Sequence, residues 1–428
     1  MMIKNFKDLA TKPEKRVALC VLEEGLCTAM PDVTIRKFVR KNRLVLGKHT
    51  ICLSKYQRIF VIALGKAADS MASTINSLMD VDSGIIVMSR GIHSRLKNKK
   101  FEIIHGGHPF PTQQSICAAK KILKFLKERK STDFIIFLIS GGSSSLVSLP
   151  DGITLNDKKI VTQLLLKSGA NIHEINCIRK HLSKIKGGRI LEYLPCDAVS
   201  LVMSDVVDDD LSSIASGLTY CDTTAFHDAK EILQKYNLIK FSPRSVLKRI
   251  DLGIAKAIPE TPKHPKIKNH IVATNKQCLI AMAKKAGELG LKTKLVYSIS
   301  GDVKDVAKKL VQAMPKESKS CLIFGGETTV KVTGRGKGGR NQELVLNVLK
   351  EIQKMDHNIT IAFVGTDGKD GNTDAAGAIM SKTEFKLKEI QNFLQNNNSY
   401  NFFKKYDGLI FTGPTHTNLM DIGIMLRQ

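Results

Sequence analysis

The feature that most constrains the fold is a regular alternation along the chain between short apolar runs and longer amphipathic stretches. The apolar runs have the length of strands, and the stretches between them place apolar residues at helical spacing. This alternation predicts an α/β fold, with a mainly parallel sheet covered by helices on both faces. The predicted strands are 58–64, 84–88, 101–104, 134–139, 198–203, 270–273, 293–297, 321–324, 329–333, 360–364 and 408–411. The clearest predicted helices are 112–127, 275–289 and 341–352.

The chain is long enough for two domains. At 428 residues it exceeds the size at which one hydrophobic core keeps growing. The segment IPETPKHP, at 258–265, has three prolines, which favour an extended connector and exclude a helix. We therefore predict an N-terminal Rossmann-like domain over 1–240, a proline-rich connector over 241–267 and a C-terminal α/β domain over 268–428.

Composition excludes several classes of protein. The formal charge of +26 would suit a nucleic-acid binder, but no basic stripe is interleaved with aromatic residues, so we expect no nucleic acid as partner. No apolar run is long enough for a membrane helix, and no membrane partner is expected. Nine scattered cysteines without a CxxC pair argue against a disulfide framework and against a zinc site. We expect a cytoplasmic protein.

Several predicted strands are followed by segments rich in Gly, Ser, Lys and Asp. These segments are Gly65-Lys66-Ala67-Ala68, Ser140–Ser145, Ser204–Asp210, Gly325–Thr329 and Gly365–Gly368. In open α/β sheets, ligands bind beyond the carboxyl ends of the strands. We therefore expect these loops to assemble into one site.

The segment Ser140–Ser145 predicts an anion-binding turn. The glycines Gly141 and Gly142 expose backbone N–H groups, and serine hydroxyls follow at a helix start. The alternative is an ordinary turn with a helix cap. A hydrolase nucleophile elbow is disfavoured because Ser145 replaces the second glycine of GxSxG.

Lys66 and Asp205 each have a functional and a structural interpretation. At the end of a strand, Lys66 could reach a phosphate as a point charge, or it could be a solvated lysine. Asp205 could be a general base or a magnesium ligand, or it could cap the following segment. The segment 365–376, GTDGKDGNTDAA, holds Asp367 but does not match a calcium-binding loop; it could hold a magnesium ion or order the facing loops.

The loop Gly334–Arg340 is the most distinctive single feature. Its glycines fit GxGxxG, so a dinucleotide site must be considered. The preceding predicted strand alternates, however, and no acidic residue ends a strand about twenty positions on. A Walker A motif also fails, because Arg340-Asn341 stands where Lys-Ser/Thr is required. A flexible loop of cations suits a polyphosphate or a phosphoryl group in transfer, although a solvated basic turn is the alternative.

Taken in order, these segments resemble the class II glycerate kinases, the glycerate 2-kinase family whose carboxyl half is the MOFRL domain. The resemblance covers nearly the whole chain, and the block GGETTV…GGRNQE is highly specific. The segments that carry it are ALGKAA (63–68), GGHPFP (106–111), LISGGSSSL (138–146), NCIRKHLSKIKGGR (176–189), SDVVDDDLSSIASG (204–217), GGETTVKVTGRGKGGRNQEL (325–344), GTDGKDGNTDAAGA (365–378) and TGPTHTN (412–418).

The resemblance implies ATP-dependent phosphorylation of D-glycerate to 2-phosphoglycerate, with Mg²⁺, by two α/β domains, the second with a mixed sheet. It implies phosphoryl-transfer roles for Lys66 and Arg340 and places Asp205 in the same site. We expect Asp205 to be the third catalytic residue, which orients or deprotonates the 2-hydroxyl, and also the candidate metal ligand. Some relatives have been named hydroxypyruvate reductase, so an NAD(P)H-dependent reductase is the alternative. A homodimer is compatible with either activity. The expected substrate- and nucleotide-binding residues are Gly65, Ser140, Gly141, Gly142, Ser143, Ser144, Glu327, Arg335, Lys337, Asn341 and Asp367.

The chain departs from the family pattern at four positions. Asp208 and His416 stand where relatives usually have Gly, Leu218 where they usually have Pro, and Thr112 where Asp is frequent. The extra carboxylate of Asp208 near the expected site predicts weaker nucleotide binding or altered use of the metal.

Overall fold

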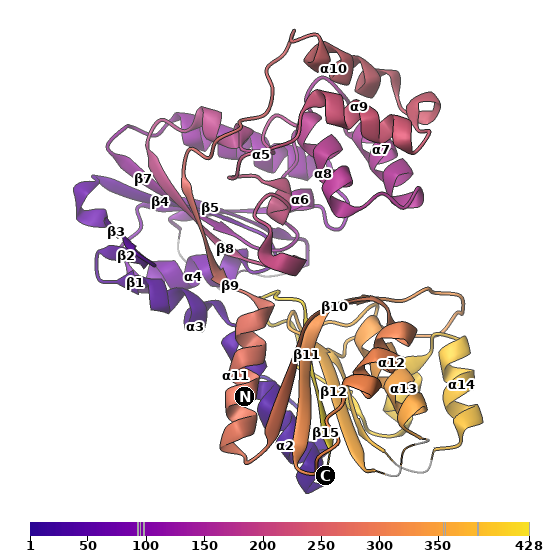
Figure 1. Ribbon diagram of the computed structural model, residues 1–428. Coiled ribbons are helices and arrows are strands. Elements are labelled where there is room, and N and C mark those ends of the chain that lie inside the picture. The colour runs from indigo at the N-terminus through magenta and orange to yellow at the C-terminus, as the bar shows by residue number, and fades with distance from the viewer. Residues whose placement is uncertain are drawn as a thin grey trace. The chain divides into compact units, whose positions relative to one another are not determined.

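The structure is a computed structural model that describes residues 1–91, 94, 96, 99–353, 355, 357–382 and 385–427. It divides into two compact units, and one of them is discontinuous in sequence (Figure 1). Residues 35–272 form the first unit, and residues 1–34 with 273–428 form the second. Among the described residues, no helix combines the length and apolar character needed to cross a membrane.

The unit of residues 35–272, here the N-terminal unit, is built on a six-stranded sheet in the order β6-β5-β4-β7-β8-β9. The pairs from β6 to β8 are all parallel. All seven residues of β7 are buried, as expected for a central strand covered on both faces. The strands of this sheet are β4 (Arg58–Leu64), β5 (Ser83–Ser89), β6 (Phe101–Gly106), β7 (Asp133–Ile139), β8 (Asp197–Met203) and β9 (Lys268–Ala273).

A small antiparallel sheet precedes the main one in the same unit, and helices follow most strands. Four of these helices, α7 to α10, enclose a separate small core of aliphatic residues (Figure 1). The small sheet consists of β1 (Val39–Arg40), β2 (Arg43–Leu46) and β3 (His49–Cys52). The helices are α3 (Pro31–Ile35), α4 (Ala68–Leu78), α5 (Gln113–Lys127), α6 (Ser143–Leu146), α7 (Leu155–Lys167), α8 (Ile172–His181), α9 (Phe226–Lys235) and α10 (Arg244–Ile254), with α3 at the boundary of the unit.

The second unit, here the C-terminal unit, holds a mixed six-stranded sheet in the order β10-β11-β15-β12-β13-β14. Only β10 and β11 pair in parallel, and β15 pairs antiparallel with both β11 and β12. The amino end of β15 therefore lies beside the carboxyl ends of two neighbouring strands. The strands are β10 (Lys292–Asp302), β11 (Ser320–Thr329), β12 (Ile359–Gly365), β13 (Gly377–Ser381), β14 (Leu409–Ile410) and β15 (Asp421–Arg427).

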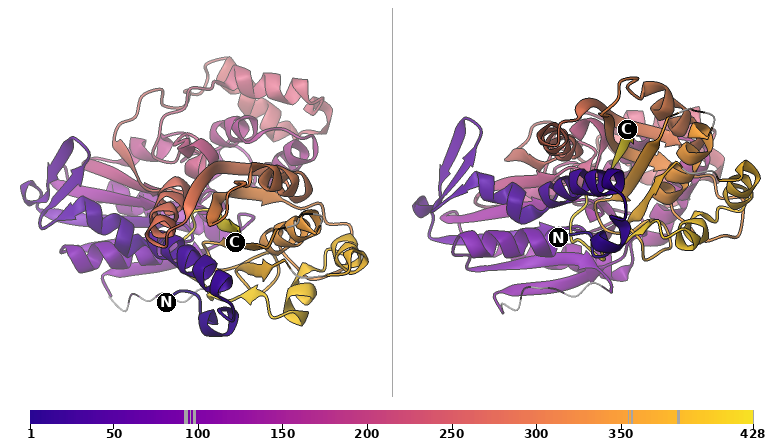
Figure 2. Two further views of the ribbon diagram at one scale, coloured as in Figure 1. Left: turned by 60° about the horizontal axis from the view of Figure 1, so that its bottom comes forward. Right: turned by 90° about the horizontal axis from the view of Figure 1, so that it is seen from below.

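Helices cover both faces of this mixed sheet. Helices α2 and α11 lie side by side against one face, while α12, α13 and α14 lie on the other (Figures 1 and 2). Where α2 approaches α11, Gly25 leaves room for the side chain of Met282, since a Cβ at Gly25 would lie 2.6 Å from Sδ of Met282. The helices are α1 (Phe6–Leu9), α2 (Pro13–Thr28), α11 (Asn275–Glu288), α12 (Val303–Ala313), α13 (Arg340–Ile352), α14 (Leu387–Gln395) and α15 (Ser399–Lys405).

The predicted α/β class is confirmed, and one predicted strand is wrong. Strand β11 continues through the glycines 325 and 326 to Thr329, so the segment expected as a loop is part of the sheet. No strand covers 330–333, which were predicted to form one. The sequence analysis did not predict β13 and β15, although β15 is the central antiparallel strand of the sheet.

The observed division of the chain differs from the predicted boundaries in two respects. Residues 1–34 belong with the C-terminal unit, because α2 buries its apolar face against that unit's sheet. The predicted connector, 241–267, contains α10, which contributes Val246 and Ile250 to the small core of the N-terminal unit. The proline-rich segment follows α10 and leads into β9, an edge strand of the N-terminal sheet.

Candidate active site

The loops after β4 and β7 are locked together in the N-terminal unit. The backbone N–H of Ala67 donates to Oγ of Ser140 at 3.0 Å, and that of Lys66 donates to the carbonyl of Gly141 at 2.9 Å. Gly65 has φ +118°, and a Cβ there would lie 2.2 Å from the Ser140 hydroxyl. Only glycine fits this position, so the turn that carries Lys66 has a fixed geometry.

The side chain of Lys66 borders the glycine-rich turn. Gly142 has φ +84°, and a Cβ there would lie 3.6 Å from Cγ of Lys66 and 3.0 Å from Cδ2 of His108. The turn therefore leaves room for the lysine stem to lie along it. Lys66 and the turn that follows β7 come together as the sequence analysis predicted.

The turn uses part of its own hydrogen-bonding capacity. The amide N–H groups of Ser143 and Ser145 donate to the carbonyls of Ser140 and Gly142, at 3.4 and 3.2 Å. The hydroxyl of Ser143 donates to the Ser140 carbonyl at 2.6 Å. These groups were expected to face an anion, and here they close the turn instead. Ser144, which is half-buried, points its hydroxyl at Ser216, with 2.5 Å between the two oxygens.

Asp205 follows β8, the neighbour of β7 in the parallel sheet. Because β4, β7 and β8 are adjacent and parallel, their carboxyl ends meet at one edge. Lys66, Ser140 and Asp205 therefore share that edge. Asp205 is half-buried, and the chain beyond it takes positive φ at Asp208 (+63°) and Asp209 (+54°).

Arg340 is held by two carboxylates in the C-terminal unit. Its Nε and Nη2 donate to the two oxygens of Asp421, at 2.7 and 3.1 Å, and its Nη1 donates to Glu327. The two parallel bonds to Asp421 fix the plane of the guanidinium. The two carboxylates raise the pKa of Arg340 above its already high usual value, against the effect of burial. Arg340 is therefore a permanently charged, oriented cation.

Asp421 is the residue around which this part of the C-terminal unit is organised. It opens β15 and pairs in register with Gly326 of β11 and Gly365 of β12, which gives it 1% exposure. Burial raises its pKa to about 7, while Arg340 acts in the opposite direction. With the Asn341 amide assigned from its hydrogen bonds, Nδ2 donates to Asp421 at 2.9 Å and Oδ1 accepts from Gly365 at 2.8 Å.

Asp370 caps the helix that begins at Arg340. The amide N–H groups of Asn341 and Gln342 donate to its two carboxylate oxygens, at 3.0 and 2.9 Å. The helix predicted over 341–352 therefore starts one residue earlier, at Arg340, and a carboxylate distant in sequence accepts hydrogen bonds from its first amides. Burial raises the pKa of Asp370 to about 6, against the stabilising hydrogen bonds.

The loop Gly334–Arg340 is tied down along most of its length. The backbone N–H groups of Thr333 and Gly334 both donate to Oδ1 of Asn397, each at 2.8 Å. The N–H of Lys337 donates to Oδ1 of Asn398 at 3.1 Å. The ammonium of Lys337 lies 3.9 Å from the ring centroid of Tyr400. The expectation of a flexible loop is therefore wrong for its backbone. Arg335 is exposed within it.

The aspartates of the 365–376 segment have separate surroundings. Oδ1 of Asp367 accepts from the amide of Lys369 at 3.1 Å, and its carbonyl accepts from the Thr415 amide at 3.3 Å. Asp374 accepts from the hydroxyl of Tyr400 at 2.8 Å, and Asp370 is the helix cap. The segment therefore orders neighbouring loops, which is one of the two roles the sequence left open.

A magnesium site in this protein would not need a complete set of protein ligands. Mg²⁺ is usually held by one or two carboxylates together with substrate phosphates. Asp205, at the edge shared with Lys66, is a carboxylate of the required kind. Among the described residues, the group of potential ligands within 4.8 Å of one another is His227, Asp228 and Glu231 on α9. None of the three is among the residues predicted to bind substrate.

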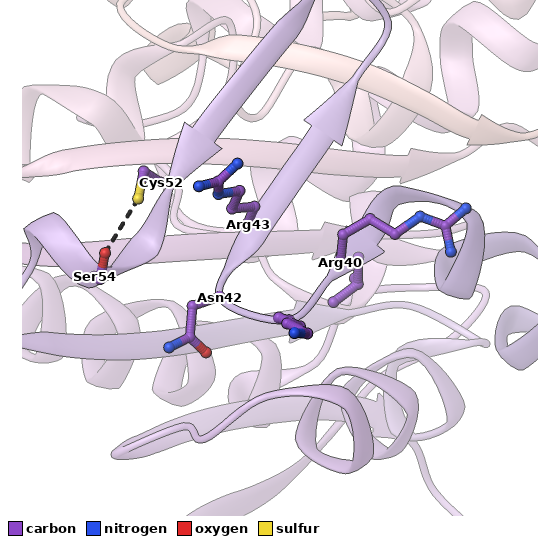
Figure 3. Close-up of a pocket in the computed structure, with 7 residues that line it drawn as sticks. Arg40, Asn42, Arg43, Cys52 and Ser54 are labelled. Carbon is purple, nitrogen blue, oxygen red and sulfur yellow. Dashed lines mark hydrogen bonds between the residues drawn. The ribbon is translucent and has the colours of Figure 1, made fainter.

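A surface pocket of about 780 Å³ lies elsewhere, against the small antiparallel sheet (Figure 3). Its lining includes Arg40, Asn42 and Arg43, and Cys52 lies 3.1 Å from the hydroxyl of Ser54. That hydrogen bond lowers the pKa of the exposed Cys52 thiol. None of the residues predicted to bind substrate or nucleotide lines this pocket.

The fold and these residues define a class of protein: two α/β units whose sheet edges carry glycine-rich turns and positioned cations, as phosphoryl transfer requires. Residues 17–251 match a domain of unknown function, DUF4147, and residues 320–421 match the MOFRL family. The glycerate 2-kinase of Pyrococcus horikoshii is 42% identical over 387 residues, which cover 86% of this chain and 87% of that protein. The D-glycerate 2-kinase of Thermotoga maritima is 34% identical over 431 residues, covering 96% and 98%.

A solved structure gives the same result. The crystal structure of a glycerate kinase from Thermotoga maritima matches with a TM-score of 0.83 at 34% identity, covering 97% of this chain and 100% of that one. The chain belongs to the class II glycerate kinase family, with its DUF4147 and MOFRL domains. The family resemblance drawn from the sequence is confirmed.

Sequence reasoning missed several residues that shape these sites. Asp421 lies just after the recognised segment 412–418, at the start of a strand that was not predicted. Asn397 belongs to a stretch that looks like a polar loop in the sequence, yet it bridges the Gly334 loop and Glu343. Lys186 lies inside the recognised segment 176–189 and reaches Ser144. Its position inside that segment was the one sign in the sequence that Lys186 could matter.

Proposed function

We propose that this chain is a glycerate 2-kinase, which transfers the γ-phosphoryl group of ATP to the 2-hydroxyl of D-glycerate. The observation that carries the proposal is the fixed orientation of the Arg340 guanidinium, which donates two hydrogen bonds to the buried carboxylate of Asp421 at the edge of the mixed sheet. A cation oriented in advance stabilises a transferring phosphoryl group without reorganising during the reaction. The family membership supplies the substrate, D-glycerate.

In this proposal three residues act on the reacting atoms. Asp205 orients the 2-hydroxyl and accepts its proton as the oxygen attacks the γ-phosphorus. The bond from that phosphorus to the β,γ-bridging oxygen breaks, and ADP leaves with the electron pair. Lys66 and Arg340 neutralise charge on the phosphoryl oxygens during the transfer.

The remaining predicted residues would bind ATP and substrate. Backbone groups of Gly65, Gly141 and Gly142, with Ser140 and Ser143, suit the phosphates, and so do Arg335 and Lys337. Ser144 would contact the substrate. Glu327, Asn341 and Asp367 would position the ligands or the cations. Asp205 would hold Mg²⁺, which when bound would neutralise charge on the phosphate oxygens.

We also propose a cytoplasmic location and a homodimer. The first is supported by the cysteines, because no disulfide bond links any of the nine, all of which lie within the described residues. Equilibrium sedimentation would test the second.

The assay that tests the function identifies the product. The protein is incubated with ATP, Mg²⁺ and D-glycerate, and enolase is then added without a phosphoglycerate mutase. Enolase consumes 2-phosphoglycerate directly, so immediate formation of phosphoenolpyruvate is expected. Product that needs a mutase first would indicate phosphorylation at the 3-hydroxyl. Oxidation of NADH or NADPH with hydroxypyruvate, in the absence of ATP, would instead support the reductase.

A further inference from the structure

Three basic side chains of the N-terminal unit have no carboxylate within salt-bridge distance among the described residues, and one of them, Lys186, contacts the glycine-rich turn. Lys158 lies on α7, Arg179 on α8, and Lys186 in the segment that follows α8. The lysines are 5% and 1% exposed, whereas Arg179 is only partly buried. Burial lowers the pKa of both lysines, and the charge of Arg179 lowers it further.

Their hydrogen bonds go to neutral oxygens. Lys158 donates to the hydroxyl of Ser148 at 2.8 Å, and Lys186 donates to the hydroxyl of Ser144 at 3.2 Å and to the carbonyl of Ala215 at 3.3 Å. Within the described part of the chain, no carboxylate lies at salt-bridge distance from Lys158, Arg179 or Lys186. Unpaired buried cations are costly, so their retention needs a reason.

A neighbouring lysine shows the ordinary solution. Lys180, on the same helix as Arg179, is 4% exposed and donates to the buried carboxylate of Asp222 at 3.2 Å. The same region of the fold can thus supply a counter-ion where the cation is structural. Lys158, Arg179 and Lys186 have no such partner in the part of the chain that the structure describes, and the half-buried Arg179 and Ser144 leave the group partly open to solvent.

A polar chain links this group to the candidate active site. Lys186 donates to Ser144, Ser144 lies 2.5 Å from Ser216, and Ser216 donates to Oδ1 of Asn176 at 3.0 Å. The Nδ2 group of Asn176 is buried and has no hydrogen-bond acceptor among the described residues. This series of hydrogen bonds therefore ends in a buried donor that has no acceptor among the described residues.

We propose that Arg179, Lys158 and Lys186, with Ser144, form the subsite that binds the carboxylate of the hydroxy-acid substrate. The inference rests on the proposed function, since the hydroxy acid is the substrate named there. A carboxylate would accept hydrogen bonds from Arg179 and Ser144 and would supply the missing counter-charge. The glycine-rich turn, which carries Ser144, would then connect this subsite to the reacting hydroxyl.

The amount of charge favours a carboxylate over the phosphates of ATP. Burial lowers the pKa of Lys158 to about 7 and lowers that of Lys186 well below its ordinary value. Arg179 stays charged although burial lowers its pKa. The group therefore carries about one to two positive charges near neutral pH, which matches a monoanion better than a polyphosphate.

The first test is the Arg179→Met variant of the full chain, with Lys167→Met as its control. Lys167 is exposed at the end of α7, so the control removes a lysine from the same region without touching the group. We expect KM for D-glycerate to rise about 10- to 100-fold, with KM for ATP changed by less than about twofold. A rise in KM for ATP alone would assign the subsite to phosphate, and no change in either constant would also overturn the proposal.

A second measurement separates this inference from the proposed function. The thermal midpoint is measured with D-glycerate, L-lactate, glycerol or inorganic phosphate and without ATP. We expect both hydroxy acids to stabilise the wild-type protein and the control, and glycerol, which lacks a carboxylate, to have no effect. Stabilisation lost in Arg179→Met supports the subsite even if glycerate is not phosphorylated. Stabilisation retained there, absent altogether, or produced by phosphate alone refutes it.

Discussion

Two groups of buried and half-buried basic side chains, one in each unit, differ in whether carboxylates neutralise them. In the C-terminal unit, Arg340 is neutralised twice, by Asp421 and by Glu327. In the N-terminal unit, Lys158, Arg179 and Lys186 gather without a carboxylate among the described residues. The first arrangement fixes a cation in place before any ligand arrives. The second leaves positive charge uncompensated until an anion binds.

This difference teaches that one feature, a positioned cation, can serve two purposes. A neutralised arginine is stable and rigid, and its free side can stabilise charge that appears only during the reaction. An uncompensated group costs folding free energy, which the binding of an anion to the folded state offsets. We therefore expect a change at the neutralised arginine to affect kcat most, and a change in the uncompensated group to affect stability and its pH dependence.

The largest effect is expected for Arg340→Ala. Loss of the oriented guanidinium should lower kcat about 10²- to 10³-fold, while KM for D-glycerate changes little, because the interaction forms mainly in the transition state. Steady-state kinetics at saturating ATP measures this split. Lys350→Ala, near the other end of α13, is the matched control and should keep nearly full activity. A near-native kcat in Arg340→Ala would remove Arg340 from the mechanism.

The second prediction concerns the pH dependence of stability and targets the uncompensated group. Lys158 faces Ser148 on one side and, from α8 and the segment after it, the charged groups Arg179 and Lys186. Its pKa is lowered to about 7 in the folded protein, whereas the unfolded chain keeps the ordinary value. Between these two values the unfolded state binds more protons, so stability rises with pH.

The measurement compares wild type with Lys158→Met by chemical denaturation from about pH 7 to pH 10. The wild-type slope should exceed that of the variant by up to about 1.4 kcal/mol per pH unit, the contribution of one proton. The variant should also be at least as stable as wild type at pH 7, because it removes a buried amine. Lys167→Met should keep the wild-type slope. Equal slopes in Lys158→Met and wild type would show that this lysine is not held neutral.

The third prediction tests the carboxylates of the C-terminal unit as structural groups. Asp370→Ala removes both acceptors from the first turn of α13 and should lower the free energy of unfolding by about 2–3 kcal/mol. Asp370→Asn keeps one acceptor and should cost roughly 1 kcal/mol. Denaturant titration measures both. If the two variants cost the same, the cap is not what Asp370 contributes.

How much of this could be predicted from the sequence depended on whether the cause was local. The strand 58–64 was predicted with its observed bounds, and the turn at Gly65 and Lys66 was placed correctly. Both predictions succeeded because the apolar run of the strand is followed directly by the glycine of the turn. The edge shared by Lys66, Ser140 and Asp205 followed from the rule that parallel strands end together.

The failures came from partners far away in sequence. Asp370 caps a helix that starts thirty positions earlier, and Asn397 holds a loop about sixty positions before it, so no local pattern shows either contact. Residues 1–34 joined the C-terminal unit through α2, although the chain gives no sign of it near Thr34. No described carboxylate lies within salt-bridge distance of Lys186, and this too is a property of the fold, since acidic residues are plentiful in the sequence.

The smallest effect is expected where the chain departs from its family, at one position in each unit. Asp208 and His416 stand where relatives usually have Gly, and both adopt positive φ, +63° and +60°. A left-handed conformation costs a non-glycine residue about 1 kcal/mol, and less for Asp, which tolerates it better than most residues. His416→Gly should therefore stabilise the protein by about 0.5–1 kcal/mol in denaturant titration, and Asp208→Gly by less.

Asp208→Gly should in addition lower KM for ATP a few-fold, because it removes a carboxylate three residues from Asp205, whereas His416→Gly should not lower it. If both substitutions destabilise the protein, these side chains make contacts worth more than the strain, and the departures are adaptations of this chain.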